Sequence, residues 1–315
     1  MIYTNNVFIT LYLNITNQCN LNCDYCYIHD KKNYEKVAPL GNLINAIDTV
    51  QPQQIVITGG EPLLHPKLIQ ALIRHYESTL SKHWDIILCT NLYYKELSKD
   101  QLDTIKMVDY IQTSYSIDRT RKAGSILEYI DHNSHIIKRD CKNIKAIDCI
   151  FTITPEQLSM ISSKEAYMLL DLKDIDDVSM ESLSYDPRID INWQEYYDKV
   201  DNYMSICSDI IPYEKNGLYK KWERCLKENI NPMNCNMCSI GCAKTYENES
   251  ILNRCNCLVH REERKDKFIN KCIECNLYEY CKMDCERFGN YCGFPKKTFT
   301  EFLNKYKTEV MLNDS

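Results

Sequence analysis

The chain has 315 residues, of which 44% are hydrophobic and 26% are charged, so it is long enough to bury a substantial core as one large or two moderate domains. A formal net charge of −6 argues against a dedicated nucleic-acid-binding protein, which normally carries a basic face. Since the first residues lack a secretory signal pattern and no run of about 20 apolar residues occurs, we expect a cytoplasmic protein with neither a nucleic-acid nor a membrane partner.

Short β-rich runs alternate with amphipathic stretches through the first 190 residues, which is typical of a parallel α/β sheet. The predicted strands are 7–16, 54–58, 85–90, 110–117, 144–154 and 177–185. Helical spacing of apolar residues predicts helices over 66–82 and 93–107. Six strands with intervening helices favour a partial (β/α)6 TIM-like barrel over residues 1–189 rather than a complete eightfold barrel.

The second part of the chain has a different texture. Residues 190–234 are expected to form a helical bridge, with an aromatic-rich helix at 191–211. The segment 235–295 is dense in cysteine and shows few strong elements, so metal coordination is expected to supply much of its stability. Residues 296–315 are expected to close the chain as an amphipathic helix.

Eighteen cysteines are many for an intracellular enzyme, where such residues are more often metal ligands or catalytic groups than disulfides. Three of them, Cys19, Cys23 and Cys26, follow the first predicted strand directly. Three thiolates at this spacing can hold three irons of a [4Fe–4S] cube and leave the fourth iron open to bind a small molecule.

Small and polar residues end the next three predicted strands. The second ends in Gly-Gly-Glu-Pro (59–62), the third in Thr90-Asn91, and the fourth carries Ser116 and Asp118. Because ligands of a parallel barrel bind where the strands finish, these residues and the cysteines are expected to line one shared cavity.

Together these motifs resemble the radical S-adenosylmethionine (radical SAM) family, whose cluster motif matches CNLNCDYC (19–26) and whose SAM amino-group site matches GGEP (59–62). The resemblance implies one [4Fe–4S] cluster, SAM as cosubstrate and an electron donor such as flavodoxin or ferredoxin. It also implies that a 5′-deoxyadenosyl radical removes hydrogen from a substrate carbon. Leu92 departs from the glycine frequent in relatives. The residues that the resemblance assigns to SAM binding are Tyr25, Tyr27, Gly59, Gly60, Glu61, Pro62, Asn91, Ser116 and Asp118.

The C-terminal cysteines resemble the SPASM extension of radical SAM enzymes, which houses two auxiliary [4Fe–4S] clusters. The resemblance assigns Cys238, Cys242, Cys255 and Cys285 to the first auxiliary cluster and Cys272, Cys275, Cys281 and Cys292 to the second. Ser250 replaces the usual glycine, and Cys235 and Cys257 lie close enough to compete as ligands. A pair of structural zinc sites is the alternative, because CxxC pairs serve zinc equally well.

Two residues are candidates for direct roles at the substrate. Cys225 in the bridge is a candidate hydrogen-atom donor to a substrate radical, and Asp186 after the sixth strand is a candidate proton acceptor. Cys89, Cys141, Cys149 and Cys207 sit in apolar or amphipathic runs and are expected to be packing residues.

The resemblance to the SPASM group implies a maturase whose substrate is a ribosomally made peptide. The modification would be a crosslink, a thioether, an epimerisation or an oxidation. A sulfatase-maturing, formylglycine-forming enzyme is an alternative, although Asn256 stands where those relatives often have Asp. A dehydrogenase of a small alcohol and a non-enzymatic metal-binding scaffold are further alternatives.

Overall fold

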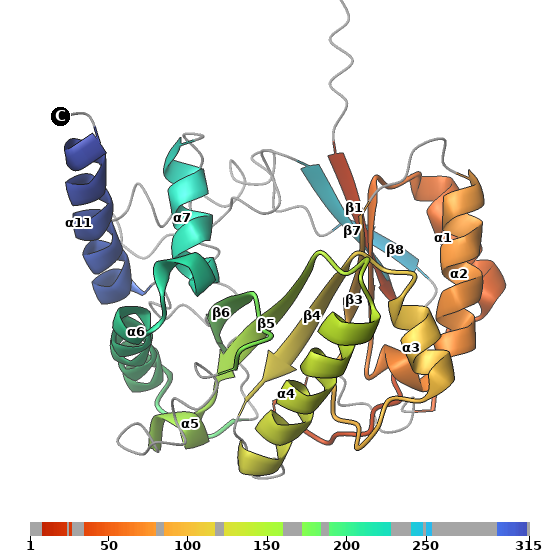
Figure 1. The fold of residues 1–315 in the computed structure, drawn as a ribbon, viewed down its shortest axis with the longest axis horizontal. Coiled ribbons are helices and arrows are strands. Elements are labelled where there is room, and N and C mark those ends of the chain that lie inside the picture. The colour runs from red at the N-terminus through yellow and green to blue at the C-terminus, as the bar shows by residue number, and fades with distance from the viewer. Residues whose placement is uncertain are drawn as a thin grey trace, which may run out of the picture.

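The computed structural model describes residues 8–23, 25–26, 35–79, 85–116, 123–159, 172–183, 189–227, 241–247, 250–253 and 295–313. Six parallel strands pair in chain order at its centre (Figure 1). They are β1 (Phe8–Asn14), β2 (Gln54–Thr58), β3 (Ile86–Cys89), β4 (Tyr110–Tyr115), β5 (Ala146–Ile153) and β6 (Asp177–Ser182). All six predicted strands are confirmed, and so is the partial barrel, since β6 ends the sheet in the described part of the chain.

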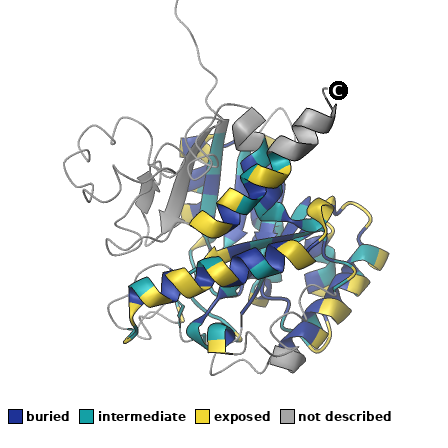
Figure 2. Ribbon diagram, turned by 90° about the vertical axis from the view of Figure 1, so that its left-hand side faces the viewer, coloured by how far each residue is buried: buried dark blue, intermediate teal, exposed yellow. Residues whose placement is uncertain are grey.

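Each strand has one buried face that packs against helices. In β5, buried residues such as Ile147 and Phe151 alternate with half-buried ones, as the period of two requires. The buried strand residues form one core cluster with helix residues such as Leu72 and Ile130. Figure 2 shows the matching pattern on the helices, where buried and exposed residues lie on different sides.

The opposite face of the sheet is more polar and curves. Tyr12 on β1 lies within the electrostatic reach of Glu181 on β6, although these strands are at opposite ends of the six-strand run. Burial raises the pKa of Tyr12, and the groups at Cys89 and Glu181 raise it further. This coupling across the sheet is what a partly closed barrel produces.

Among the described residues, five helices and a short 3-10 turn connect the strands. They are α1 (Leu40–Val50), η2 (Pro62–Leu64), α2 (Pro66–Thr79), α3 (Lys99–Ile105), α4 (Ala123–Asp140) and α5 (Pro155–Ser159). The predicted helix over 66–82 is confirmed as α2, and the one over 93–107 is confirmed in the shorter form of α3. Helix α3 begins at a capping box, in which the Ser98 and Gln101 side chains bond each other's backbone amides.

The chain after β6 builds a helical layer with an aromatic core. Its elements are α6 (Trp193–Ile210), η4 (Tyr213–Lys215), α7 (Gly217–Lys227) and α11 (Lys296–Asn313), so the helices predicted at 191–211 and at the C-terminal end are confirmed. Trp222 on α7 packs against Phe299 and Phe302 on α11, with ring centroids 4.9 and 5.4 Å away. The amide of Thr298 donates to Asp201 on α6 at 3.0 Å, which fixes the start of α11.

In the described residues of the cysteine-dense segment, where few elements were expected, two strands form. Strand β7 (Gly241–Glu247) pairs parallel to β1, and β8 (Ser250–Asn253) returns antiparallel to β7. They extend the barrel sheet beyond β1, so part of the segment 235–295 is continuous with the barrel.

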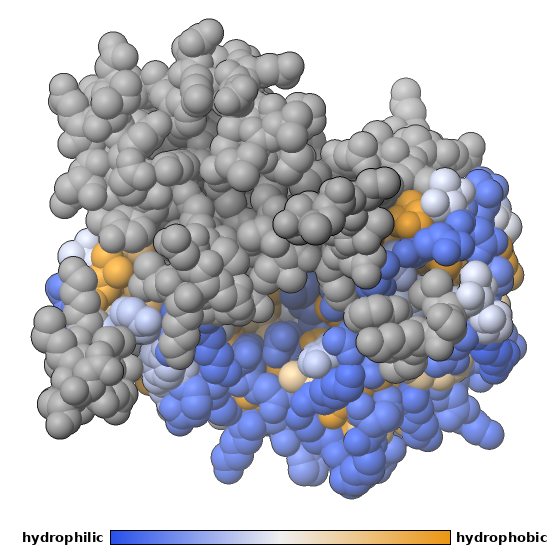
Figure 3. Space-filling view, turned by 90° about the horizontal axis from the view of Figure 1, so that it is seen from above, coloured by the Kyte–Doolittle hydropathy of each residue, from blue (hydrophilic) through white to orange (hydrophobic). Residues whose placement is uncertain are grey.

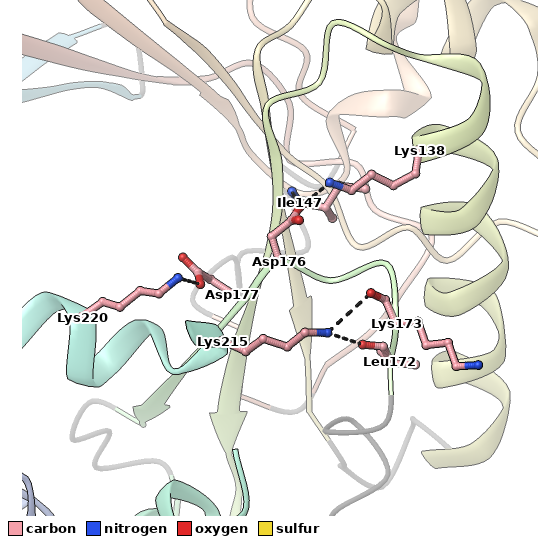
Figure 4. A network of polar contacts seen from close by, with 8 residues as sticks. All are labelled: Lys138, Ile147, Leu172, Lys173, Asp176, Asp177, Lys215 and Lys220. Carbon is pink, nitrogen blue, oxygen red and sulfur yellow. Dashed lines mark hydrogen bonds and ion pairs between the residues drawn. The ribbon is translucent and has the colours of Figure 1, made fainter. Parts of the chain in front are cut away.

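Charged side chains cluster at the amino ends of β5 and β6 (Figure 4). Asp176 accepts a hydrogen bond from Lys138 Nζ at 2.5 Å and another from the Ile147 amide at 2.7 Å, and Lys220 pairs with Asp177. These contacts tie α4 and α7 to the end of the barrel opposite the cysteine loop.

The surface of the described residues in Figure 3 is predominantly hydrophilic. Large hydrophobic side chains exposed there are limited to Leu64, Ile210 and Tyr213 in the described ranges. None of the described helices has the length and apolar character needed to cross a membrane.

Candidate functional site

The loop after β1 carries three half-buried cysteines, Cys19, Cys23 and Cys26, none of which is in a disulfide. The amide of Cys26 donates to the carbonyl of Cys23 at 3.2 Å, so these two residues share one tight turn. Thiolates are the usual ligands of a [4Fe–4S] cluster, and this donor set fits one. In the described part of the chain, no group of three or more His, Cys, Asp or Glu side chains is arranged to hold a single metal ion.

The two glycines of the GGEP motif let the end of β2 lie directly against this loop. A Cβ atom on Gly59, whose φ is +146°, would lie 2.4 Å from the carbonyl oxygen of Thr16, and one on Gly60 would lie 2.2 Å from that of Gln18. The Gly60 amide donates to Thr16 and the Glu61 amide donates to Gln18, each at 2.7 Å. The glycine pair therefore packs directly against the backbone of Thr16 and Gln18, just before the first cysteine.

Glu61 is fully buried and connects the ends of β2 and β3. Its carboxylate accepts hydrogen bonds from the Leu63 amide at 3.0 Å, the Thr90 hydroxyl at 2.8 Å and the Asn91 amide at 2.7 Å. Burial raises the pKa of Glu61, while these donors oppose the rise. The side chain thus holds the turn that carries Asn91.

Asn91 reaches from this turn to the cysteine loop. Its Oδ1 accepts from the Tyr93 amide at 2.8 Å. Its Nδ2 donates to Asn20 Oδ1 at 2.7 Å and lies 3.8 Å from Cys19 Sγ, within reach of an N–H···S bond. Asn20 Nδ2 donates in turn to the Tyr93 carbonyl at 2.8 Å. The first cysteine is therefore linked to the end of β3 through side-chain amides.

Leu92, the departure from the frequent glycine, adopts the left-handed conformation all the same, with φ of 51°. That conformation costs an L-residue about 1–2 kcal/mol. The Leu92 side chain is fully buried, and Asn133 on α4 donates to the carbonyls of Leu92 and Tyr94 at 2.9 and 2.7 Å. Apolar burial and these bonds offset the strain, so the turn forms without glycine.

Tyr25, the aromatic residue before the third cysteine, is joined to the end of β4. Its hydroxyl is 2.5 Å from the hydroxyl of Ser116, a fully buried residue. The structure thus brings together Tyr25, Asn91, Ser116, the GGEP motif and the cysteine loop at the carboxyl ends of β1 to β4. Their contacts with SAM stay a prediction.

Other predicted site residues are not placed by the structure. Tyr27, Asp118, Asp186, Cys238, Cys255, Cys272, Cys275, Cys281, Cys285 and Cys292 lie outside the described residues. For Cys225 and Cys242 the backbone alone is described, in α7 and β7. Cys242 pairs in register with Ile9 near the start of β1, whereas Cys19 follows the end of that strand.

The four cysteines expected to be packing residues are part of the barrel and α6. Cys141, Cys149 and Cys207 are buried, as predicted. Cys89 is half-buried, and its thiol donates to Gln112 Oε1 at 3.3 Å. Burial raises the pKa of Cys89 to about 12, so it is a neutral thiol at neutral pH.

Residues 13–150 match the family model of the radical SAM superfamily. This part of the chain is a radical SAM domain. The matched range includes the end of β1, all of β2 to β4, the cysteine loop and the GGEP motif. A radical SAM domain implies SAM and a [4Fe–4S] cluster as its cofactors.

Curated relatives include protein MJ1632 of Methanocaldococcus jannaschii, which is 30% identical over 138 residues, or 43% of this chain and 46% of the relative. A GTP 3′,8-cyclase of Helicobacter pylori is 31% identical over 122 residues, or 36% of each chain. This chain thus spans less than half the length of these two relatives. A GTP 3′,8-cyclase of Clostridium botulinum is 26% identical over 278 residues, which covers 81% of this chain and 82% of the relative.

Two solved structures of anSMEcpe share the fold over nearly the whole chain. One, with bound AdoMet and the Kp18Cys peptide, has a TM-score of 0.66 at 13% identity and covers 95% of this chain and 99% of its own. The other, with bound AdoMet and the Cp18Cys peptide, has a TM-score of 0.64 at 14% identity and covers 98% and 99%. At these identities the likeness shows the fold alone. The shared fold includes the radical SAM domain and the chain that follows it.

Proposed function

We propose that the protein is a radical SAM peptide maturase, which uses a 5′-deoxyadenosyl radical to take hydrogen from a residue of a ribosomally made peptide. The observation that carries this proposal is the likeness of fold along almost the whole chain to anSMEcpe, which binds AdoMet together with a peptide. The cysteine spacing from Cys272 to Cys285, typical of a SPASM extension, supports the same class of substrate.

In this proposal, each group of residues at the strand ends has its own role. Cys19, Cys23 and Cys26 hold the cluster, which when bound supplies the electron that cleaves SAM. Glu61 and the glycine pair keep the ends of β2 and β3 against the cysteine loop. The contact between the Tyr25 and Ser116 hydroxyls fastens that loop to β4, and these two residues would hold SAM together with the GGEP motif.

Auxiliary clusters are part of the same proposal. We assign Cys238, Cys242, Cys255 and Cys285 to one and Cys272, Cys275, Cys281 and Cys292 to the other, with flavodoxin or ferredoxin as the external electron donor. Four protein ligands for each cluster suit electron transfer rather than substrate binding. Cys225 as a hydrogen-atom donor and Asp186 as a proton acceptor remain proposals for the substrate side.

The first test is cleavage of SAM by the anaerobically reconstituted, reduced protein, measured as 5′-deoxyadenosine by mass spectrometry. Cys23→Ala is expected to abolish product, because the cluster loses one of its three ligands. The matched control is Cys141→Ala, which removes a buried thiol at the end of α4 and is expected to retain cleavage. Product formation by Cys23→Ala would contradict the assigned cluster.

The second part of the test identifies the substrate class by mass spectrometry of a candidate peptide encoded beside this protein. Loss of two hydrogen atoms indicates oxidation or crosslinking, and uptake of one deuteron from deuterated water without other change indicates epimerisation. A nucleotide substrate is the competing candidate, because the C. botulinum GTP 3′,8-cyclase matches over most of both chains. Conversion of GTP, with the peptide unchanged, would overturn the peptide proposal.

A further inference from the structure

We propose that Asn91 is a positioning residue for the cluster: its side-chain amide donates an N–H···S hydrogen bond to the Cys19 thiolate and thereby raises the reduction potential of the cluster. The proposal rests on the radical SAM domain and on Cys19 as a cluster ligand. It does not depend on whether the substrate is a peptide.

The orientation of the Asn91 amide is fixed by its partners. The Tyr93 backbone amide can only donate, so the atom that faces it at 2.8 Å must be the side-chain oxygen. The side-chain nitrogen then faces Asn20 Oδ1 at 2.7 Å and Cys19 Sγ at 3.8 Å. Asn20 is oriented in the same way, because its nitrogen donates to the Tyr93 carbonyl at 2.8 Å.

Cys19 needs donors of this kind once it binds iron. A thiolate has no proton, so its 4.0 Å contact with Asn20 Oδ1 as a thiol donor is lost on ionisation. The Leu21 amide, 3.4 Å from Cys19 Sγ, and the Asn91 side-chain amide both point N–H groups at the sulfur. These two contacts match an acceptor sulfur and gain strength when it carries negative charge.

The donor is held in place before any cluster binds. The Asn91 backbone amide is anchored on the fully buried Glu61 carboxylate at 2.7 Å. The next residue is locked in the left-handed conformation, with its carbonyl bonded by Asn133. Because the turn is fixed from both sides, the Asn91 side-chain amide already lies beside Cys19 Sγ in the cluster-free chain.

The expected consequence is electrostatic. Reduction adds an electron to the cluster, so N–H groups at its sulfurs stabilise the reduced form more than the oxidised form. Loss of the Asn91 donor should therefore lower the reduction potential and make the electron harder to load. Asn20 reinforces the effect by polarising the same amide through its oxygen.

Asn91→Ser and Asn91→Asp test this with the reconstituted holoenzyme in an anaerobic redox titration monitored by electron paramagnetic resonance. Both variants keep an oxygen for the Tyr93 amide, but neither offers N–H to Cys19. We expect about a tenfold loss in the equilibrium constant for reduction in Asn91→Ser, which is about 59 mV for a one-electron couple. Asn91→Asp should shift further in the same direction because it adds a negative charge.

The control is Asn143→Ala, which removes a side-chain amide that donates to the Val108 carbonyl at 2.6 Å, before the amino end of β4 and away from the cysteine loop. It should leave the potential unchanged, and iron per chain is measured in every variant. If Asn91→Ser does not incorporate the cluster, the potential of Asn91→Asp decides. An unchanged potential in the Asn91 variants, or an equal shift in Asn143→Ala, would overturn the proposal.

Discussion

At the scale of single residues, the side chain and the glycines of the GGEP motif make structural contacts within the chain, in addition to any contact with a ligand. Three donors of the chain occupy the two carboxylate oxygens of Glu61, and both glycines are pressed against backbone oxygens of the loop before Cys19. The motif therefore holds the ends of β2 and β3 against the cysteine loop.

Glu61→Gln should destabilise the cluster-free protein by about 1–3 kcal/mol, because an amide offers one oxygen where the carboxylate offers two. Either the Asn91 amide or the Leu63 and Thr90 donors would then face an NH2 group. Denaturant unfolding under reducing conditions measures the difference, with the exposed Glu96→Gln as control. Equal stability of the two variants would show that the three bonds contribute little.

The sequence allowed prediction of the motif residues but not of the contacts among them. Cysteine spacing and strand-end positions predicted Cys19, the GGEP motif, Asn91 and Ser116, because those signals are local in the chain. Asn20, by contrast, stands inside the cysteine motif with no pattern to mark it. Its role depends on bonds to Asn91 and Tyr93, more than 70 positions away, which only the fold brings near.

At the scale of elements, predictability followed the continuity of the apolar pattern. All six strands were predicted from runs of β-branched residues. Helix α4 was not predicted, because Asn133 and Ser134 are polar yet fully buried and interrupt the apolar stripe. Helix α1 was also missed, although its buried residues Leu43, Ala46, Ile47 and Val50 have helical spacing. The hairpin of β7 and β8 escaped prediction because its pairing with β1 is a long-range contact.

Strand register also places carboxylates side by side. Asp148 on β5 pairs in register with Asp177 on β6, and its Oδ1 is buried with no hydrogen-bond partner among the described residues. Burial and the charges of Asp177 and Asp176 raise the pKa of Asp148 to about 6, although Lys220 and Lys138 oppose the rise.

This raised pKa predicts a pH dependence of stability. Between the unfolded pKa of about 4 and the folded value of about 6, the folded chain binds a proton that the unfolded chain has lost, so stability falls as pH rises. Above pH 6, Asp148→Asn should be more stable than wild type by about 1–2 kcal/mol, allowing for solvent screening. Urea unfolding at several pH values measures this.

A surface control separates this effect from a general change in charge. Asp103→Asn alters an exposed carboxylate that pairs with Lys106, and it should change stability by no more than about 0.5 kcal/mol at any of these pH values. Parallel pH profiles for wild type and Asp148→Asn would mean that Asp148 has an ordinary pKa in the folded protein.

At the scale of the whole molecule, the proposal of two auxiliary clusters predicts the iron content of the protein. The reconstituted wild-type protein should hold about twelve irons per chain, four for each cluster. Cys275→Ala should lower that count while leaving SAM cleavage intact, and Cys23→Ala should lower it and stop cleavage. Metal analysis measures the iron count, and 5′-deoxyadenosine formation measures SAM cleavage. About four irons in the wild type, or zinc in place of iron, would exclude the auxiliary clusters.

The hairpin of β7 and β8 and the helix α11 have a joint consequence for residues 254–294. The fold tethers this cysteine-rich stretch at both ends, at β8 on one side and at the Asp201 contact with α11 on the other. Fixing the two ends of a segment lowers the entropy that its closure still has to lose. Any metal site whose ligands come from between these two anchors would therefore form at a smaller entropic cost than one on a chain that is held at one end.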